Sequence, residues 1–249
     1  MKFKTEKPAT LLAIDTNAKT VKGRSQGYYT GILYLSPADM SGKNVCPAAE
    51  MAGCKAACLN TAGRGIYSKV QAARLRKTKL YFDDRHWFMN QLHRDVQSLQ
   101  RKCQRDGYLP AVRLNGTSDI DWQHVPYQVE GVTYRNIFSA FPRVVFYDYT
   151  KYLMLAKEPN YHLTFSYSGT AAYAATASKA LKTDLSMSVV FRGEPPKFYL
   201  GRKVVDGDKD DLRFLDPPRS IIALKPKGQA KKDASGFVVD LIPVEQVAC

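Results

Sequence analysis

Apolar and polar residues follow two different periods along the chain, which indicates strands followed by helices. Residues 31–39 (GILYLSPAD) form an apolar run rich in β-branched and aromatic residues, the pattern of a buried strand. From residue 68 to about residue 106 the apolar positions recur at near-helical spacing, and Gly107 ends that stretch. The first half of the chain therefore predicts a buried strand, a polar loop and a long helical region.

The second half continues this alternation. Short helices are predicted at 135–142 and 170–183. Because strands alternate with helices and are apolar enough to be buried on both faces, we expect a parallel sheet, either doubly wound or curled into a barrel. The further strands are predicted at the start of 109–122, at 143–152, 161–169 and 185–193, and once or twice within 203–217 and 220–228.

The chain has 249 residues, of which 45% are hydrophobic, enough for one α/β domain. We expect an N-terminal strand and loop (1–30), a barrel-like core (31–228) and a C-terminal extension (229–249). No apolar run is long enough to span a membrane and nothing resembles a signal peptide, so we expect no membrane partner and a cytoplasmic location. An odd number of cysteines, five, argues against a disulfide framework.

Polar side chains follow several of the predicted strands. Cysteines come after strand 31–39, and the polar stretches 115–121, 147–151 and 166–168 each end or follow a later strand. The carboxyl ends of parallel strands form one rim of a sheet or barrel, and ligands bind there. We therefore expect one rim to collect the reactive side chains.

Three cysteines, Cys46, Cys54 and Cys58, lie in one loop with the spacing C-x7-C-x3-C. Thiolates suit zinc, copper(I) and iron–sulfur clusters. Three thiolates in a glycine-containing loop match a [4Fe–4S] cluster with one iron open to an added ligand, and buried unreactive thiols are a further interpretation. A structural zinc site is another interpretation, but it needs a distant fourth ligand. The candidates for that ligand are Cys103, Cys249, His86, His93, His124 and His162.

A strand followed by a three-cysteine loop and about five alternating units resembles radical S-adenosylmethionine (SAM) enzymes. The resemblance implies a single-domain partial (β/α)6-like barrel, a [4Fe–4S] cluster and SAM bound to the open iron. By the same resemblance, residues 115–119 would contact the methionyl amine, and Thr164 and Ser166 the ribose. The spacing here differs from the C-x3-C-x2-C that is usual in those enzymes.

Almost the whole chain also resembles the uncharacterised phage "gene product 88" family. The resemblance covers about residues 10 to 240 and implies a bacteriophage or prophage origin and action in the cytoplasm of a bacterial host; it implies no particular activity. The stretches that carry it are YLSPADMSGKNVCP, CKAACLNTAGRG, ARLRKTKLYF, RLNGTSDIDW, FPRVVFYDYTKY, NYHLTFSYSG and VVDGDKDDLRFLDP.

Two further polar stretches are candidates for binding a small molecule. RLNGTSDIDW (113–122) and FYDYTKY (146–152) each place charged and hydroxyl groups at a strand end, although ordinary turn residues or core aromatics explain them as well. With the two residues named above, the predicted ligand-binding set is Asn115, Thr117, Ser118, Asp119, Tyr147, Asp148, Lys151, Thr164 and Ser166.

The aspartates of VVDGDKDDLRFLDP (204–217) suggest a divalent cation, but the EF-hand pattern is absent. We expect them instead to pair with Arg202, Arg213 and Arg219. A metal-dependent nuclease that uses Asp119, Asp121 and the aspartates of 206–211 is a third functional alternative.

The net charge is +14, from 37 Lys and Arg against 23 Asp and Glu, which favours a polyanionic partner. The stretch 64–79 would present a basic ridge to phosphates if it is helical, or else a solvated face. The leading hypothesis is therefore a phage-encoded [4Fe–4S] protein, with a metal-stabilised nucleic-acid-binding protein as the alternative. The predicted nucleic-acid-binding residues are Arg64, Lys69, Arg74, Arg76, Lys77 and Lys79.

Overall fold

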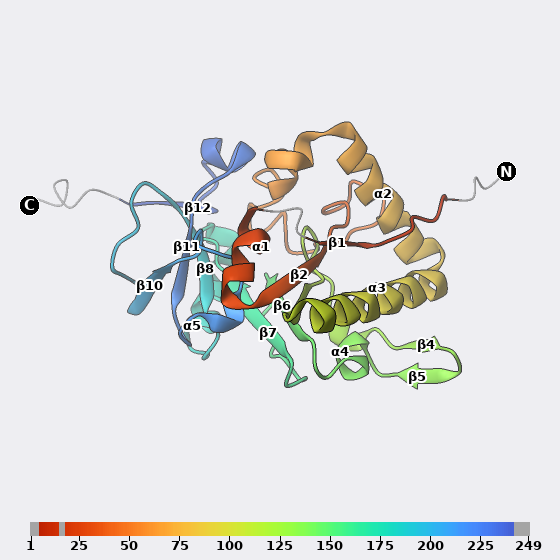
Figure 1. Cartoon of the computed structure of the whole chain (residues 1–249). Coiled ribbons are helices and arrows are strands. Elements are labelled where there is room, and N and C mark those ends of the chain that lie inside the picture. The colour runs from red at the N-terminus through yellow and green to blue at the C-terminus, as the bar shows by residue number, and fades with distance from the viewer. Residues whose placement is uncertain (1–4, 15–17, 242–249) are drawn as a thin grey trace, which may run out of the picture.

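The computed structural model describes residues 5–14 and 18–241, which form a mixed α/β fold built on one large sheet (Figure 1). A separate two-stranded hairpin, β4–β5, lies beside α3 and α4. The strands are β1 (Leu12–Ile14), β2 (Tyr28–Leu33), β3 (Leu109–Arg113), β4 (Tyr127–Val129), β5 (Val132–Tyr134), β6 (Val145–Thr150), β7 (Tyr161–Ser166), β8 (Met187–Arg192), β9 (Phe198–Tyr199), β10 (Arg202–Asp206), β11 (Ile221–Leu224) and β12 (Val238–Asp240). The helices are α1 (Ala18–Lys22), α2 (Ser68–Asp83), α3 (Arg85–Asp106), α4 (Ile137–Ala140) and α5 (Ala174–Leu181).

The ten-stranded sheet has the order β1-β2-β3-β6-β7-β8-β11-β10-β9, and β12 pairs with the end of β8. Every pair from β2 to β10 along this path is parallel, whereas β1 and β9 pair antiparallel at the two edges. The expected mostly parallel sheet is therefore confirmed. The order departs from the chain order after β8, where β11 is the next strand and β10 and β9 lie outside it.

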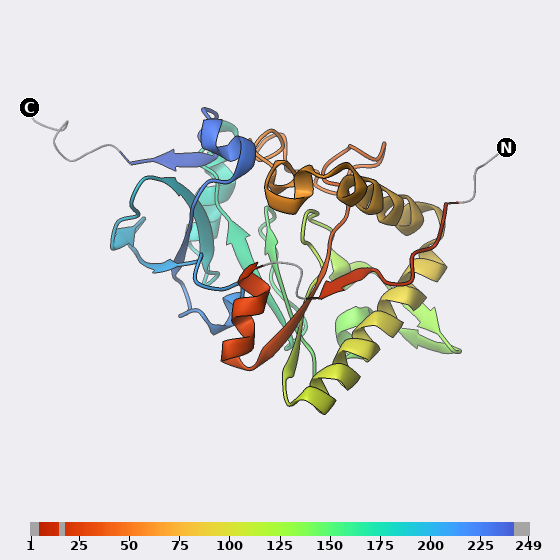
Figure 2. The ribbon, with the colours of Figure 1, turned by 45° about the horizontal axis from the view of Figure 1, so that its top comes forward.

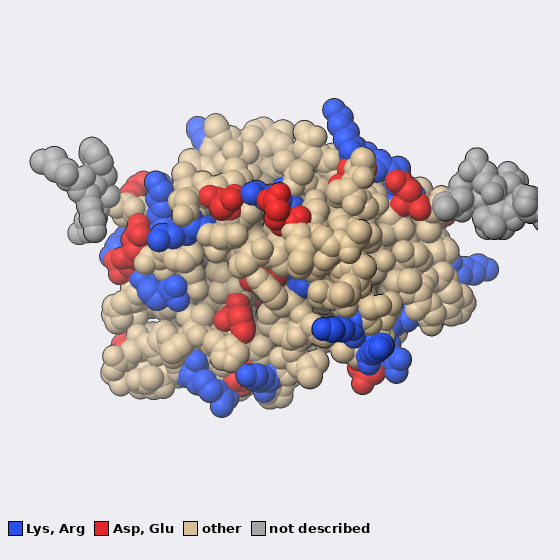
Figure 3. All heavy atoms as spheres, turned by 180° about the vertical axis from the view of Figure 1, so that it is seen from behind, with Lys and Arg blue, Asp and Glu red and all other residues tan. Residues whose placement is uncertain are grey.

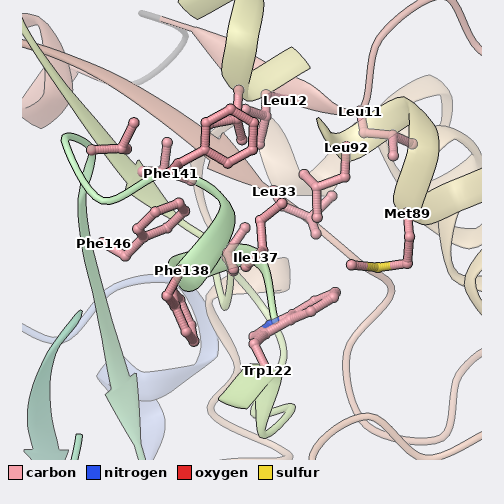
Figure 4. Close-up of a cluster of buried hydrophobic side chains, with 14 of the residues drawn as sticks. Leu11, Leu12, Leu33, Met89, Leu92, Trp122, Ile137, Phe138, Phe141 and Phe146 are labelled. Atoms are coloured by element: carbon pink, nitrogen blue, oxygen red, sulfur yellow. The ribbon is translucent and has the colours of Figure 1, made fainter. Parts of the chain in front are cut away.

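The apolar face of the sheet is covered by helices. α3, α4 and the strands β2, β3 and β6 share one buried cluster, which Figure 4 shows around Leu33, Leu92, Phe138 and Phe146. A second cluster joins α5 to β7, β8 and β11. Side chains on alternate strand positions point to this face, and burying them supplies the main driving force for folding.

The opposite face of the sheet is polar. Thr30, Arg113, Tyr147 and Thr164 are on it, because their neighbours in each strand point to the helices. Residues 206–216 cross this face: Leu212 packs with Tyr147 and Ala111, and Phe214 stacks edge-on against Tyr28 and Tyr147. Charged side chains are therefore buried between this face of the sheet and residues 206–216, as in the pair of Arg113 and Asp211.

Two local features differ from the sequence prediction. The helical region 68–106 is two helices, because the Asp84 side chain accepts the Trp87 N–H at 3.2 Å and caps a new helix. The hairpin β4–β5 was not predicted. Its turn residues Glu130 and Gly131 both have positive φ, 49° and 81°, as a tight two-residue hairpin turn requires.

Candidate functional site

The cysteine-containing loop, residues 44–61, lies over the carboxyl ends of the parallel strands. The Val45 carbonyl accepts the Asp119 N–H at 2.8 Å, which ties the loop to the segment after β3. The Ser168 hydroxyl donates to the Ala52 carbonyl at 2.8 Å and the Thr170 hydroxyl to the Met51 carbonyl at 3.0 Å, which tie it to the segment after β7. The loop is thus fastened to the expected rim at two separate strands.

The C-terminal part of the chain packs against the same loop. The Gln229 N–H donates to the Thr61 hydroxyl at 3.1 Å, and Ala57 packs with Ala230 and Val238 (Figure 2). Segments nearly 170 residues apart in the chain therefore hold the loop in place from both sides.

Gly53, in the middle of this loop, has a φ of +69°, which side-chain-bearing residues rarely adopt. A Cβ at this position would also lie 3.0 Å from the Thr170 Cγ2 and would clash with the Ser235 side chain. Both the backbone conformation and the close packing require glycine at this position, directly before Cys54.

The three thiols are half-buried and lie within electrostatic reach of one another. Burial, with smaller contributions from Asp119 and the other two thiols, raises the pKa of Cys46 to about 12. Burial also raises the pKa values of Cys54 and Cys58, while Lys151 opposes the shift at Cys54. Without a bound cation the three groups are therefore thiols rather than thiolates at neutral pH.

Each sulfur also has one polar contact with its own surroundings. The Cys46 Sγ donates to the Thr117 carbonyl at 3.6 Å and the Cys54 Sγ to the Ala49 carbonyl at 3.7 Å. The Cys58 Sγ accepts the Asn60 N–H at 3.5 Å. The Asn60 N–H contact is of the kind that stabilises a metal-bound thiolate, whereas the two contacts with carbonyls need the proton of the thiol.

Among the residues described, no three or more His, Cys, Asp or Glu side chains are close enough to hold a single metal ion. A tetrahedral zinc site with Zn–S bonds of about 2.3 Å needs thiolates roughly 3.8 Å apart. The thiolates of a [4Fe–4S] cluster each bind a different iron and lie farther apart. The absence of such a group among the described residues supports neither the zinc site nor the [4Fe–4S] cluster.

Two buried charged residues complete the site. The Lys151 ammonium donates to the carbonyls of Ser166 at 2.8 Å and Tyr167 at 3.0 Å; burial lowers its pKa to about 8, whereas Cys54 and Asp119 act to raise it. The Asp119 Oδ2 accepts the backbone N–H of Lys151 at 2.8 Å, and burial raises the pKa of this carboxyl to about 6. Of the predicted ligand-binding residues, these are the two whose charges act on the cysteines: Asp119 raises the pKa values of Cys46 and Cys54, and Lys151 lowers that of Cys54.

Three other predicted ligand-binding residues hold the loop after β3. The Asn115 Oδ1 accepts the Ser118 hydroxyl at 2.9 Å, the Ile120 N–H at 3.0 Å and the Trp122 indole N–H at 3.0 Å. The Thr117 hydroxyl donates to the Leu35 carbonyl at 2.5 Å. The Asn115 and Ser118 side chains bond within their own loop, which is the ordinary turn interpretation, whereas Thr117 ties that loop to the segment after β2.

The remaining predicted residues divide between the two faces of the sheet. Tyr147 donates its hydroxyl to Asp211 at 3.1 Å under residues 206–216, away from the cysteines. Thr164 pairs with Tyr149 in the strand register and lies on that polar face, almost fully buried. The carbonyl of Ser166 contacts Lys151, so Ser166 belongs to the rim.

Asp148 lies on the opposite, helix-covered face and is almost fully buried. Its Oδ1 accepts the Asn115 N–H at 2.6 Å and its Oδ2 the Tyr161 hydroxyl at 3.2 Å. Burial raises the pKa of this carboxyl to about 8, so the folded protein favours the protonated acid.

We expect the Asp148→Asn substitution to make the protein relatively more stable at alkaline pH. A carboxyl whose folded-state pKa is raised stabilises the fold at low pH, and that contribution is lost as pH rises from about 4 to about 8. The amide cannot ionise, so urea unfolding at pH values of about 5 and about 8 should show the variant gaining on the wild type at the higher pH. An equal difference at both pH values would contradict the raised pKa.

The predicted basic ridge is only partly exposed. Arg74 is buried and donates to the Asn60 side chain at 2.5 Å, and Lys77 donates to the Leu11 carbonyl at 3.1 Å. Arg76 pairs with Glu6 at 2.5 Å. The other three basic residues are exposed and form no ion pair with any residue in the described ranges: Arg64, Lys69 and Lys79.

Of the three arginines expected to pair with the aspartates of 204–217, only Arg213 does so. Arg213 contacts Asp210 at 3.1 Å and Asp216 at 3.2 Å. Arg202 instead donates to the carbonyls of helix α5 and the residues after it, and Arg219 pairs with Asp184. Asp211 pairs with Arg113, a partner that the sequence did not predict.

Sequence reasoning did not select the hydroxyl residues that fasten the cysteine loop. Ser168 and Thr170 hold its backbone, and Tyr173 donates its hydroxyl to the Lys151 carbonyl. The signal was present as a cluster of hydroxyl residues after β7 (SYSGT), at the same rim as the cysteines. Their partners are carbonyls, which every residue has, so the contacts themselves could not be predicted.

Fold and site together define an α/β protein whose mostly parallel sheet carries three half-buried cysteines, a lysine and an aspartate at its carboxyl-end rim. The Gene product 88 family matches residues 10–241, and the chain belongs to this phage protein family. This confirms the resemblance found in the sequence. No curated protein and no solved structure matches the chain.

None of the helices in the described part of the chain is long and apolar enough to cross a membrane.

Proposed function

We propose that this chain binds a [4Fe–4S] cluster through Cys46, Cys54 and Cys58. The supporting observation is that all three half-buried sulfurs belong to one loop that is fastened over the rim of a parallel sheet. Parallel α/β sheets bind cofactors and substrates at this rim. A cluster held by three thiolates leaves one iron able to bind a small chelating molecule, such as SAM.

The proposal includes a partial barrel. The strands β2, β3, β6, β7, β8 and β11 lie in chain order and are all parallel, as in a (β/α)6 partial barrel. The Lys19 ammonium of α1 pairs with Asp208 at 2.7 Å, which links the region before β2 to the segment after β10. Such a contact between the two ends of the parallel series is expected where a sheet curls toward closure.

The residues of the chain have distinct tasks in this proposal. Burial keeps the cysteines protonated, so cluster binding must release their protons, and the thiolates are then stabilised by iron. The buried Lys151 ammonium offsets part of the negative charge beside Cys54. The bound cluster would supply one-electron chemistry, and the protein orientation and electrostatics.

Anaerobic reconstitution with iron and sulfide tests this function. We expect a brown protein with broad absorption in the blue and near-ultraviolet, and a paramagnetic resonance signal after reduction. Addition of SAM should change that signal if the open iron binds it. A reconstituted protein that stays colourless and shows no such signal contradicts the proposal.

A second candidate is nucleic-acid binding, favoured by the three exposed basic residues Arg64, Lys69 and Lys79. On the face shown in Figure 3, lysines and arginines lie in separate groups with acidic residues between them, rather than in one continuous patch. Non-specific binding is therefore expected to be weak and to depend on few phosphate contacts.

For this second candidate we expect a shallow salt dependence. Each phosphate contact contributes about −0.9 to the slope of log K against log salt on duplex DNA, so the triple change of Arg64, Lys69 and Lys79 to glutamine should remove a slope of up to about 3. Fluorescence anisotropy on labelled duplex DNA measures this. The same slope in wild type and variant would exclude these residues from the contact.

A further inference from the structure

Asp119 has a buried carboxylate oxygen with no hydrogen-bond partner beside the cysteines. Its side chain is only 9% exposed, and its Oδ1 has no hydrogen-bond partner among the described residues, although the nearby Thr150 hydroxyl acts to lower the pKa of the carboxyl. Its other oxygen, Oδ2, is held by the Lys151 N–H at 2.8 Å. Burying an oxygen without a hydrogen-bond partner costs about 1–3 kcal/mol. The site therefore favours a bound cation or hydrogen-bond donor at this oxygen.

The carboxyl lies among the same residues that carry the thiols. The Asp119 N–H bonds to Val45, next to Cys46, and the Cys46 Sγ bonds to the carbonyl of Thr117, two residues before Asp119. The negative charge of Asp119 also raises the pKa values of both Cys46 and Cys54. Asp119 is therefore oriented by its neighbours as a fourth anionic group of this site.

Four of the six other groups that the sequence offered as a fourth ligand are engaged elsewhere. Cys103 is buried in the α3 core, and the His93 ring lies against Tyr127 and Phe141. His124 pairs with Asp121 and Lys157 on the surface, and the His162 ring packs against Phe214 under residues 206–216. His86 is exposed on the first turn of α3, and Cys249 lies outside the described residues.

We infer that Asp119 is the fourth protein ligand of the site, its free Oδ1 binding the iron that the three cysteines leave open until a small molecule displaces it. This inference rests on the proposed cluster. Oxygen ligation through one carboxylate oxygen, with the second oxygen held by a backbone N–H, is a common way of orienting metal ligands. The buried Lys151 ammonium partly balances the added negative charge.

Mild oxidation of the reconstituted full-length protein distinguishes a four-ligand site from a three-ligand site. Removal of one electron from a [4Fe–4S]²⁺ cluster with an unprotected iron releases Fe²⁺ and leaves [3Fe–4S]⁺, which has a characteristic resonance signal. We expect the wild type to keep its iron after one equivalent of ferricyanide. Asp119→Asn should lose roughly one iron per cluster and show the three-iron signal, and Asp119→Cys should keep its iron, because a thiolate replaces the carboxylate.

Asp121→Asn is the matched control, since Asp121 is two residues away and pairs with His124 at 2.6 Å on the surface. It should behave as the wild type. Ready conversion of the wild type to the three-iron form overturns the inference while leaving the cluster itself established, whether or not the Asp119 variants fold. A wild type that binds no cluster refutes the proposed function as well, so the two failures are distinguishable.

Discussion

Replacing Cys54 by serine is expected to yield a folded protein whose iron and sulfide content falls to background. The residue is half-buried in a loop whose backbone is held by Ser168 and Thr170, not by its own thiol, so the fold should survive the change. A serine oxygen is a poor iron ligand compared with a thiolate. Cys46→Ser and Cys58→Ser should behave alike, measured as iron and acid-labile sulfide per chain after anaerobic reconstitution.

Cys103→Ala is the control for this series. Cys103 is fully buried in the apolar core of α3, so its replacement should lower the free energy of unfolding by about 1–2 kcal/mol and leave the iron content unchanged. If iron binding were lost equally in all four variants, or in none, the loop cysteines would not be the ligands.

Replacing Asp211 by alanine is expected to destabilise the fold by about 3–5 kcal/mol, because it leaves the Arg113 guanidinium buried without its partner. Arg113 contacts Asp211 at 3.2 Å, and their side chains are only 11% and 6% exposed. The Tyr147 hydroxyl loses an acceptor at the same time. Chemical denaturation followed by circular dichroism measures the change in the free energy of unfolding.

Asp184→Ala is the matched comparison for that prediction. Asp184 pairs with Arg219 at a similar distance, 3.3 Å, but both side chains are largely exposed. Exposed pairs contribute little, so this variant should unfold close to the wild type. Equal effects of the two substitutions would show that residues 206–216 do not bury a required charge pair.

The mostly parallel sheet and its polar rim were predictable because they depend on local patterns. Residues 161–166 (YHLTFS) alternate apolar and polar side chains, which indicates a strand, and polar residues directly after parallel strands share one edge of the sheet. The placement of β10 outside β11 was not predictable, since strand order is decided by long-range packing. The break at Asp84 was missed because an N-cap aspartate within a long helical pattern resembles an ordinary polar surface position.

The candidate site was predicted in part for a similar reason. Cysteine spacing is visible in a sequence, and so the loop was found. Asn115, Thr117 and Asp119 looked alike as polar residues after a strand, yet the first two satisfy backbone groups of nearby segments and the third keeps a free oxygen. Whether a polar side chain finds a hydrogen-bond partner depends on which distant segments fold next to it. The spacing of residues in the sequence does not predict that.

The most direct test of the proposed centre is the iron and acid-labile sulfide content of the protein produced and purified without oxygen. A cluster bound by Cys46, Cys54 and Cys58 predicts about four irons and four sulfides per fully loaded chain. A folded protein that carries zinc alone, or neither iron nor sulfide after reconstitution, would contradict it.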